Sequence, residues 1–214
     1  MLLVQLREGI VSHLWRHAAL YFFILTLLVL GIVSGAVSVA ALAGEEKAQL
    51  VSYLKLFFRS AGRGSLDLSG AVLLRDVFFA NLKTAGVMWF LGLSVVGAPL
   101  VSVVLFIRGF ALGFTVGFLV DELGFRGLLL ALLSVLPPNL VAIPAWSFLG
   151  VSALSFAVYL FRRGRRDSRR AVMAAVSNYL MAGLLGVAML FLSGLIDAYV
   201  SPVFINILGA GLGD

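Results

Sequence analysis

The sequence predicts an all-α, polytopic integral membrane protein with five transmembrane helices and a broken, re-entrant central segment. Hydrophobic residues make up 62% of the 214 residues and charged residues 12%, against about 25% charged in soluble domains. Apolar stretches of about 20 residues, long enough to cross a bilayer, recur along the chain. The net charge is +6, but the basic residues cluster at the ends of these stretches, which favours orientation toward membrane lipid over nucleic-acid binding.

The chain begins with an amphipathic lead-in, residues 1–17, which we expect at the cytoplasmic membrane surface. The first span follows at residues 18–43. Its end, Ala41-Leu42-Ala43, matches a signal-peptide cleavage pattern. The apolar run is nevertheless about 25 residues long, whereas the apolar region of a signal peptide has about 7 to 15. We therefore expect an uncleaved anchor.

Residues 44–84 form the main polar connection and predict an external loop of two short amphipathic helices. Their apolar faces can lie on the bilayer, pack on one another or dock a partner protein. We assign partner binding to the face of the first helix. Five residues share this face: Leu50, Tyr53, Leu54, Phe57 and Phe58.

The second predicted span, residues 85–107, contains Gly97-Ala98-Pro99, where we expect a kink, and ends at Arg108. A third, broken crossing follows at residues 109–136. Glycine recurs there at every fourth position, which exposes backbone along one helix face, and a phenylalanine stripe runs beside it. This pattern is typical of a helix-packing or oligomerisation surface, within the chain or across a homodimer. The residues are Gly109, Gly113, Gly117, Phe110, Phe114 and Phe118.

The third crossing is too short to be a simple span. Residues 109–120 would make about 18 Å of helix, against a hydrocarbon core of about 30 Å. We expect a short helix followed by a partial re-entry, with Pro137, Pro138 and Asn139 at its turn. Asn139 either satisfies carbonyl groups freed there or coordinates an ion.

The last two spans are predicted at residues 140–161 and 171–196, and residues 197–214 form an external tail. Between the spans lie six arginines in the nine residues 162–170. Because positively charged loops remain on the cytoplasmic side, this cluster fixes the N-terminus inside and the C-terminus outside. The whole chain, 1–214, is treated as one membrane domain.

No group of residues predicts catalysis. Asp121 and Glu122 are adjacent and point about 100° apart on a helix, so we expect them at the outer interface with Arg126 as their partner. His13 and His17 have no third metal ligand nearby. The Gly-Leu-Gly-Asp at 211–214 resembles an intramembrane protease motif but has no second aspartate in a neighbouring span. We therefore expect no enzymatic activity, no metal and no cofactor.

Three stretches resemble the stage II sporulation protein M family. They are Gly97-Ala98-Pro99, then FIRGFALGFTVGFLV from Phe106 to Val120, then LPPNL from Leu136 to Leu140 with Ile143-Pro144-Ala145. The resemblance implies a bacterial cytoplasmic-membrane protein that acts in engulfment during endospore formation. It also implies two partners, stage II sporulation proteins P and D, which degrade peptidoglycan. Pro99, Arg108, Pro137, Pro138, Asn139 and Pro144 are the structural residues of these stretches.

The resulting hypothesis is a non-catalytic scaffold at the septal membrane that anchors a peptidoglycan remodelling complex, with the loop 44–84 docking the partners. The alternative is a small-solute or ion transporter or channel built around the broken central segment. A cavity that reaches mid-membrane and is lined by Asp121 or Asn139 would favour transport. A closed apolar interior with an exposed external groove would favour the scaffold.

Overall fold

The computed structural model describes residues 17–62, 70–162 and 169–209, and every element within these ranges is helical, as the sequence predicts. The lead-in 1–16, residues 163–168 of the arginine cluster and residues 210–214 of the tail lie outside the described residues. In chain order the elements are α2 (Ala18–Ala40), α3 (Gly44–Gly62), α4 (Gly70–Gly92), α5 (Gly97–Leu130), the π-helical turn η1 (Ala131–Val135), α6 (Leu136–Arg162) and α7 (Arg169–Gly209).

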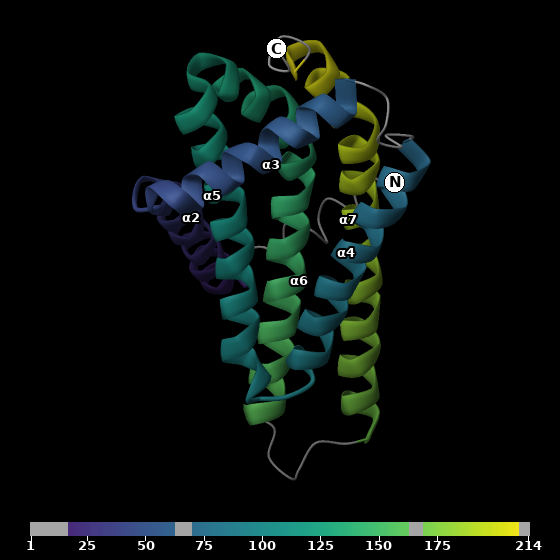
Figure 1. Cartoon of the computed structure of the whole chain (residues 1–214). Coiled ribbons are helices and arrows are strands. Elements are labelled where there is room, and N and C mark those ends of the chain that lie inside the picture. Colours follow the sequence, from purple (N-terminus) through teal and green to yellow (C-terminus); the bar gives the residue numbers. More distant parts are fainter. Residues whose placement is uncertain (1–16, 63–69, 163–168, 210–214) are drawn as a thin grey trace.

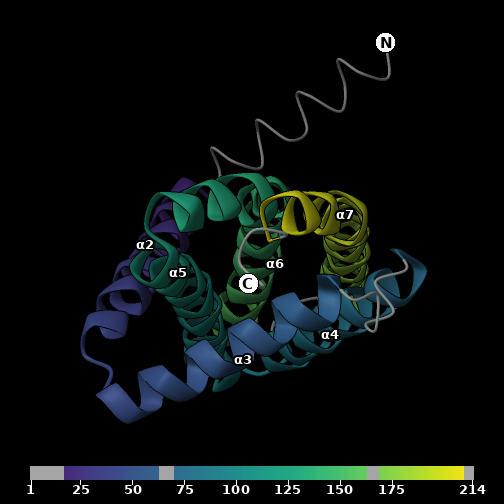
Figure 2. The same cartoon turned by 45° about the horizontal axis from the view of Figure 1, so that its top comes forward.

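Five of the helices lie lengthwise in a bundle, and α3 crosses one end of it (Figures 1 and 2). Helices α5 and α7 run in one direction, while α4 and α6 run in the other (Figure 1). Helix α2 packs on α5 and runs parallel to it, since Gly31 of α2 meets Phe106 and Gly35 meets Phe110. The end of the bundle that α3 covers is called the α3 end below.

Three helical stretches within the described residues are long and apolar enough to cross a membrane: Ala18–Ala40, Gly97–Arg162 and Arg169–Ile205. The second of these has 66 residues and folds back on itself, so it supplies two helices of the bundle (Figure 1). Helix α4 is not among the three, and Arg75, Asp76 and Lys83 interrupt its apolar run.

The chain reverses direction at residues 93–96, and not near Arg108 as the sequence predicted. The predicted second span, 85–107, is therefore divided between α4 and α5. Gly97 permits the tight reversal, because an added Cβ there would collide with the carbonyl group of Leu91. Pro99 lies in the first turn of α5, where its missing N–H costs no helical hydrogen bond, so it starts a helix instead of kinking one.

The break in the central segment lies at Gly124 and not at Pro137-Pro138-Asn139. Gly124 has φ 57° and ψ −129°, a conformation that side-chain-bearing residues rarely adopt. Helix runs from Gly97 up to this break, about 40 Å at 1.5 Å per residue, so the third crossing is not short. Because the helix begins twelve residues earlier than expected, the predicted re-entrant turn is not needed.

The prolines lie within helix. The π-helical turn η1 directly precedes them, and the N–H of Leu136 donates to the carbonyl of Ala131 five residues back. A wider turn of this kind accommodates residues that cannot continue the regular hydrogen-bond ladder. Pro144 also lies inside α6. At the other end of the chain, α7 continues as helix through Asp197, where the sequence predicted an exit into a tail.

The core is apolar and lies between the long helices. Its largest fully buried side chains include Ile24, Met88, Leu105, Val151 and Leu190, which come from five different helices. The outward faces are apolar as well: Phe22 of α2 is 76% exposed and Phe161 of α6 is 75% exposed. An apolar surface around an apolar core suits a bundle that is surrounded by lipid.

A ring stack joins α4, α6 and α7 inside the bundle. Tyr179 lies parallel to Phe156, with ring centroids 4.4 Å apart, and stacks on Trp89 at 5.8 Å. Its hydroxyl donates to the carbonyl oxygen of Trp89 at 2.8 Å. The buried phenol is therefore both packed and hydrogen-bonded, as a tyrosine inside an apolar interior requires.

Candidate functional site

The predicted glycine face lies against α2 of the same chain. An added Cβ at Gly109 would collide with the carbonyl oxygen of Leu28, and one at Gly113 with that of Ile32. At Gly117 an added Cβ would lie 3.0 Å from the Cα of Ala36, which is a tighter approach than nine in ten real Cβ contacts. The two backbones can approach this closely only because the side chains are absent.

Helix α2 contributes glycines of its own to this contact. Gly31 and Gly35 of α2 face the backbone of Phe106 and Phe110. Both helices therefore contribute glycines that are four residues apart. Sequence reasoning missed these two glycines, although their spacing repeats the signal read at Gly109. We call the contact of Gly31 and Gly35 with Gly109, Gly113 and Gly117 the glycine seam.

The phenylalanine stripe stacks on itself along α5. The rings of Phe110 and Phe114 lie 6.2 Å apart, and those of Phe114 and Phe118 lie 6.3 Å apart. Phe118 is buried, whereas Phe110 and Phe114 are half-buried. The stripe therefore flanks the glycine seam and stiffens the same helix.

At the α3 end, one lysine holds α3 against α5. Lys47 Nζ lies 2.6 Å from Asp121 Oδ2 and 3.0 Å from Glu122 Oε1. The hydrogen bond with Asp121, and then the one with Glu122, raise the pKa of Lys47 above its usual range. The prediction that Arg126 pairs with Asp121 and Glu122 is wrong, because both carboxylates pair with Lys47, while Arg126 follows the break at Gly124 and is exposed.

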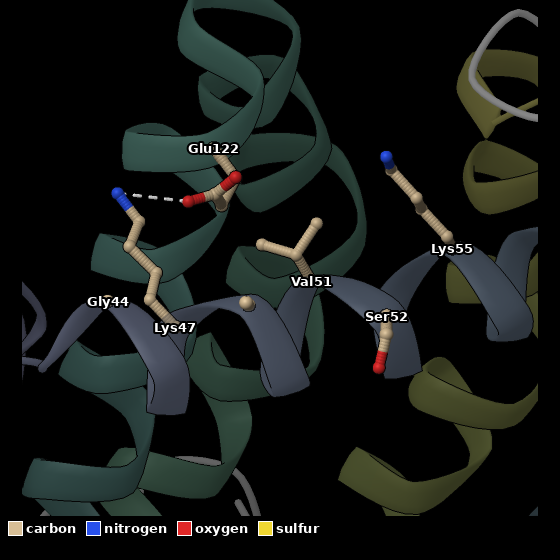
Figure 3. A pocket seen from close by; sticks show the side chains of 7 residues that line it. Gly44, Lys47, Val51, Ser52, Lys55 and Glu122 are labelled. Carbon is tan, nitrogen blue, oxygen red and sulfur yellow. Dashed lines mark ion pairs between the residues drawn. The ribbon is translucent and has the colours of Figure 1, made fainter.

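A groove lies beside this ion pair, between α3 and the end of α5 (Figure 3). It has a volume of about 450 Å³. The lining includes Lys47, Val51, Lys55 and Glu122, so charged side chains frame an apolar floor. Figure 3 shows Glu122 reaching from α5 toward Lys47 on α3. An exposed groove is one of the two features by which the scaffold hypothesis is distinguished from transport.

The predicted partner-binding face is only partly free. Tyr53 is 69% exposed, whereas Leu50 and Leu54 are half-buried. Leu56, which was not predicted, is 62% exposed. The side chains of Phe57 and Phe58 lie outside the described part of the chain. Tyr53 and Leu56 are therefore the large apolar side chains that the described part of α3 offers to a partner.

Arg108 lies inside the bundle rather than at the end of a span. It is in α5, eleven residues after the helix begins at Gly97 and sixteen before the break at Gly124. Its Nη2 donates to Thr84 Oγ1 of α4, and its guanidinium carbon lies 4.5 Å from the ring centroid of Trp146 on α6. Thr84 and Trp146 are site residues that the sequence did not reveal. A cation at this depth costs about 2.5 to 3.5 kcal/mol on insertion scales, so its environment points to a function.

A cavity of about 240 Å³ borders Arg108 and extends between α2, α5 and α6. Thr115 of α5 and Asn139 of α6 line it farther toward the α3 end. The Asn139 amide donates to the carbonyl of Val135 at 2.7 Å, which is the structural use that the sequence predicted as one option. Asp121 does not line this cavity. The described residues thus combine an apolar core with a pocket beside Arg108 that is open on the side of Ala111 and Thr115, both of which are exposed.

Two serines of α7 satisfy carbonyls around the π-helical turn. Ser193 donates to the carbonyl of Pro138 at 2.8 Å, and Ser201 donates to that of Ser134 at 2.8 Å. Because Pro138 has no N–H, the carbonyl of Ser134 lacks its normal helical donor, and Ser201 supplies one. The LPPNL stretch is therefore built into the α6–α7 interface.

Comparison with known protein families decides the classification. The model of stage II sporulation protein M matches residues 24–202, which is most of the chain. This chain belongs to the stage II sporulation protein M family. No curated protein and no solved structure gives a match.

The family match spans the bundle from α2 to α7 and includes each stretch on which the sequence resemblance rested. In this member of the stage II sporulation protein M family, the first stretch forms the α4–α5 reversal. The second carries Arg108 and half of the glycine seam, and the third forms the π-helical turn and the start of α6. These stretches therefore form the α4–α5 reversal, the α5 side of the α2–α5 contact and part of the α6–α7 interface.

Of the remaining candidates in this family member, His17 is the one that the structure describes. His17 Nδ1 is 3.2 Å from Ser155 Oγ on α6, while His13 and the 211–214 motif lie outside the described ranges. Among the residues that the structure describes, no three His, Asp or Glu side chains group closely enough to hold a metal ion.

Proposed function

We propose that this stage II sporulation protein M family member is a non-catalytic membrane scaffold that anchors peptidoglycan-degrading partners on its external face. Family membership supports a sporulation-related membrane protein. The observation that carries the scaffold role is the α3 end of the bundle. There Lys47 fixes an amphipathic helix to α5 beside an open groove, and Tyr53 and Leu56 remain exposed.

The proposed topology has five crossings, formed by α2, α4, α5 up to the break, α6 and α7, with the N-terminus inside. The arginine-rich residues 162–170 and the reversal at 93–96 then lie in the cytoplasm, and α3 lies outside. The external position of α3 is what a docking platform for peptidoglycan enzymes needs. The partners implied by the family are stage II sporulation proteins P and D.

A docking role for α3 is tested by co-purification from detergent-solubilised membranes. The double variant Tyr53→Ala/Leu56→Ala removes the exposed apolar surface of α3, and we expect recovery of partners P and D to fall at least about tenfold, because anchor side chains dominate interfaces. The matched control is Phe22→Ala, which removes an equally exposed aromatic from the flank of the bundle. Undiminished recovery with the double variant would reject α3 as the docking surface.

Transport is the second candidate function, and the cavity beside Arg108 favours it because Arg108 and Asn139 bring polar groups to a space between α2, α5 and α6. Since the chain contains no cysteine, Thr115→Cys would place a single reporter thiol on the cavity wall. If the protein is a transporter, a membrane-impermeant thiol reagent should label this cysteine when it is added on either side of the membrane. Failure of the reagent to label the cysteine from either side would argue against transport and in favour of the scaffold.

A further inference from the structure

The cavity beside Arg108 has the chemistry of a ligand site. Arg108 enters it from α5, and across the described residues its partners are neutral: the Thr84 hydroxyl and the Trp146 ring. The ion pairs of the described residues involve Lys47 alone, so no described carboxylate balances the guanidinium. A guanidinium carries five N–H donors, and one hydroxyl acceptor does not satisfy them.

The walls of the cavity restrict what could pair with Arg108. Most are aliphatic, with Leu28 and Ile32 from α2, Leu112 from α5 and Ile143 from α6. The two other polar side chains are neutral, and each donates one hydrogen bond to a carbonyl four residues back, Thr115 Oγ1 to Ala111 and the Asn139 amide to Val135. Arg108 is therefore the one charged side chain in a lining that is mostly aliphatic.

The dimensions also limit the ligand. The cavity runs from Arg108 to Thr115 along α5 and from Trp146 to Asn139 along α6, about 10 Å in each case at 1.5 Å per residue. Its volume of about 240 Å³ corresponds to roughly eight water molecules at about 30 Å³ each. The lining contains a single cation, Arg108, so it would neutralise only half the charge of a divalent oxyanion. A single negative charge on a small apolar body fits both the charge and the walls.

We propose that this cavity binds a short-chain monocarboxylate, with the carboxylate on Arg108 and the hydrocarbon body against Leu28, Ile32 and Ile143. The planar guanidinium fork matches a carboxylate and pairs with it by two parallel hydrogen bonds. The aliphatic walls would bury the hydrocarbon body. No residue of α3 lines this site, so the ligand proposal does not rest on the scaffold role.

Trp146 provides the test, because its ring lies against the Arg108 guanidinium. The full chain in lipid nanodiscs, with Trp15→Phe and Trp89→Phe, has Trp146 as its sole tryptophan. Titration with propionate should give a saturable change in its fluorescence. Propionamide, the neutral isostere, should give none at the same concentrations. No saturable change with propionate, or an equal change with propionamide, would overturn the proposal.

Variants of Arg108 distinguish propionate binding at this site from a non-specific effect of propionate on the protein or the lipid. Arg108→Gln should weaken propionate binding at least about tenfold, and Arg108→Lys should weaken it less, because the charge remains and the fork is lost. Arg126→Gln is the matched control, since it removes an exposed arginine beyond the break. The shift of the unfolding midpoint by propionate in the otherwise unmodified chain gives a second readout. Unaltered propionate binding in Arg108→Gln would overturn the assignment.

Discussion

Single glycines determine how closely α2 and α5 approach. The steric overlap that an added Cβ would cause differs from one glycine of the seam to the next. At Gly113 an added Cβ would meet backbone atoms of Ile32, whereas at Gly117 it would meet Ala36 at 3.0 Å. Both neighbours are backbone atoms, but the overlap is deeper at Gly113, where the added Cβ would lie closer to the Ile32 carbonyl group than real Cβ contacts come. The site at Gly113 should therefore tolerate a methyl group less well than the site at Gly117.

We expect Gly113→Ala to destabilise the protein by about 1 to 3 kcal/mol through overpacking, and Gly117→Ala by less. The measurement is the unfolding free energy in mixed micelles. Gly86→Ala is the control, because an added Cβ there has no neighbour within 4 Å and should be neutral or stabilising by about 0.4 to 1 kcal/mol. Equal stability of Gly113→Ala and Gly86→Ala would contradict close packing at the seam.

The ion pair of Lys47 predicts a pH dependence at the residue scale. Its pKa is raised in the folded state by Asp121 and Glu122, so its contribution is fully present below the ordinary lysine pKa of about 10.4. This contribution is lost as the pH rises through the higher, folded-state pKa. A spin label at Ser52→Cys on α3 should gain mobility in that alkaline range.

In Lys47→Met the same label should be mobile at neutral pH and should show no further change in the alkaline range. High salt should also loosen the label in the parent protein, because the partners are partly exposed and salt screens such pairs. A label that stays immobile in Lys47→Met would show that other contacts hold α3.

At the scale of elements, Gly124 divides α5 from the segment that leads into α6. An added Cβ there would have no neighbour within 4 Å, and the φ of 57° is the whole obstacle to a side chain. Gly124→Ala therefore isolates backbone strain from packing. We expect it to cost about 1 to 3 kcal/mol of unfolding free energy.

Gly86→Ala again serves as the comparison, since Gly86 has the same open space within a regular helix. A neutral Gly124→Ala would mean that the break is not held in this conformation. Because the break allows α6 to return beside α5, the predicted loss should also appear as weaker α5–α6 packing.

For the whole molecule, the proposed five-crossing topology makes a labelling prediction. Ser52 is exposed on α3 and Ser94 is exposed in the α4–α5 reversal, at opposite ends of the bundle (Figure 1). With no native cysteine in the chain, Ser52→Cys should react with an impermeant maleimide in intact cells. Ser94→Cys should react only after permeabilisation. The reverse pattern would invert the topology and place α3 in the cytoplasm.

Composition and spacing alone predicted a helical membrane protein and a face of α5 with glycine at every fourth position. These features depend on local order: apolar length, helical periodicity and neighbouring charges are properties of one segment. The family resemblance likewise came from contiguous stretches, and the family match over residues 24–202 confirms it.

The tertiary structure alone decided where the chain turns and which residues meet. A hydropathy window that covers residues 85–107 averages over the reversal at 93–96. The sequence around a proline also does not distinguish a helix kink from a first helical turn. The contacts of Arg108 with Thr84 and Trp146, and of Lys47 with Asp121, join separate helices. Such contacts depend on the relative rotation and height of packed helices, which is set by the whole bundle and is not encoded in any one segment.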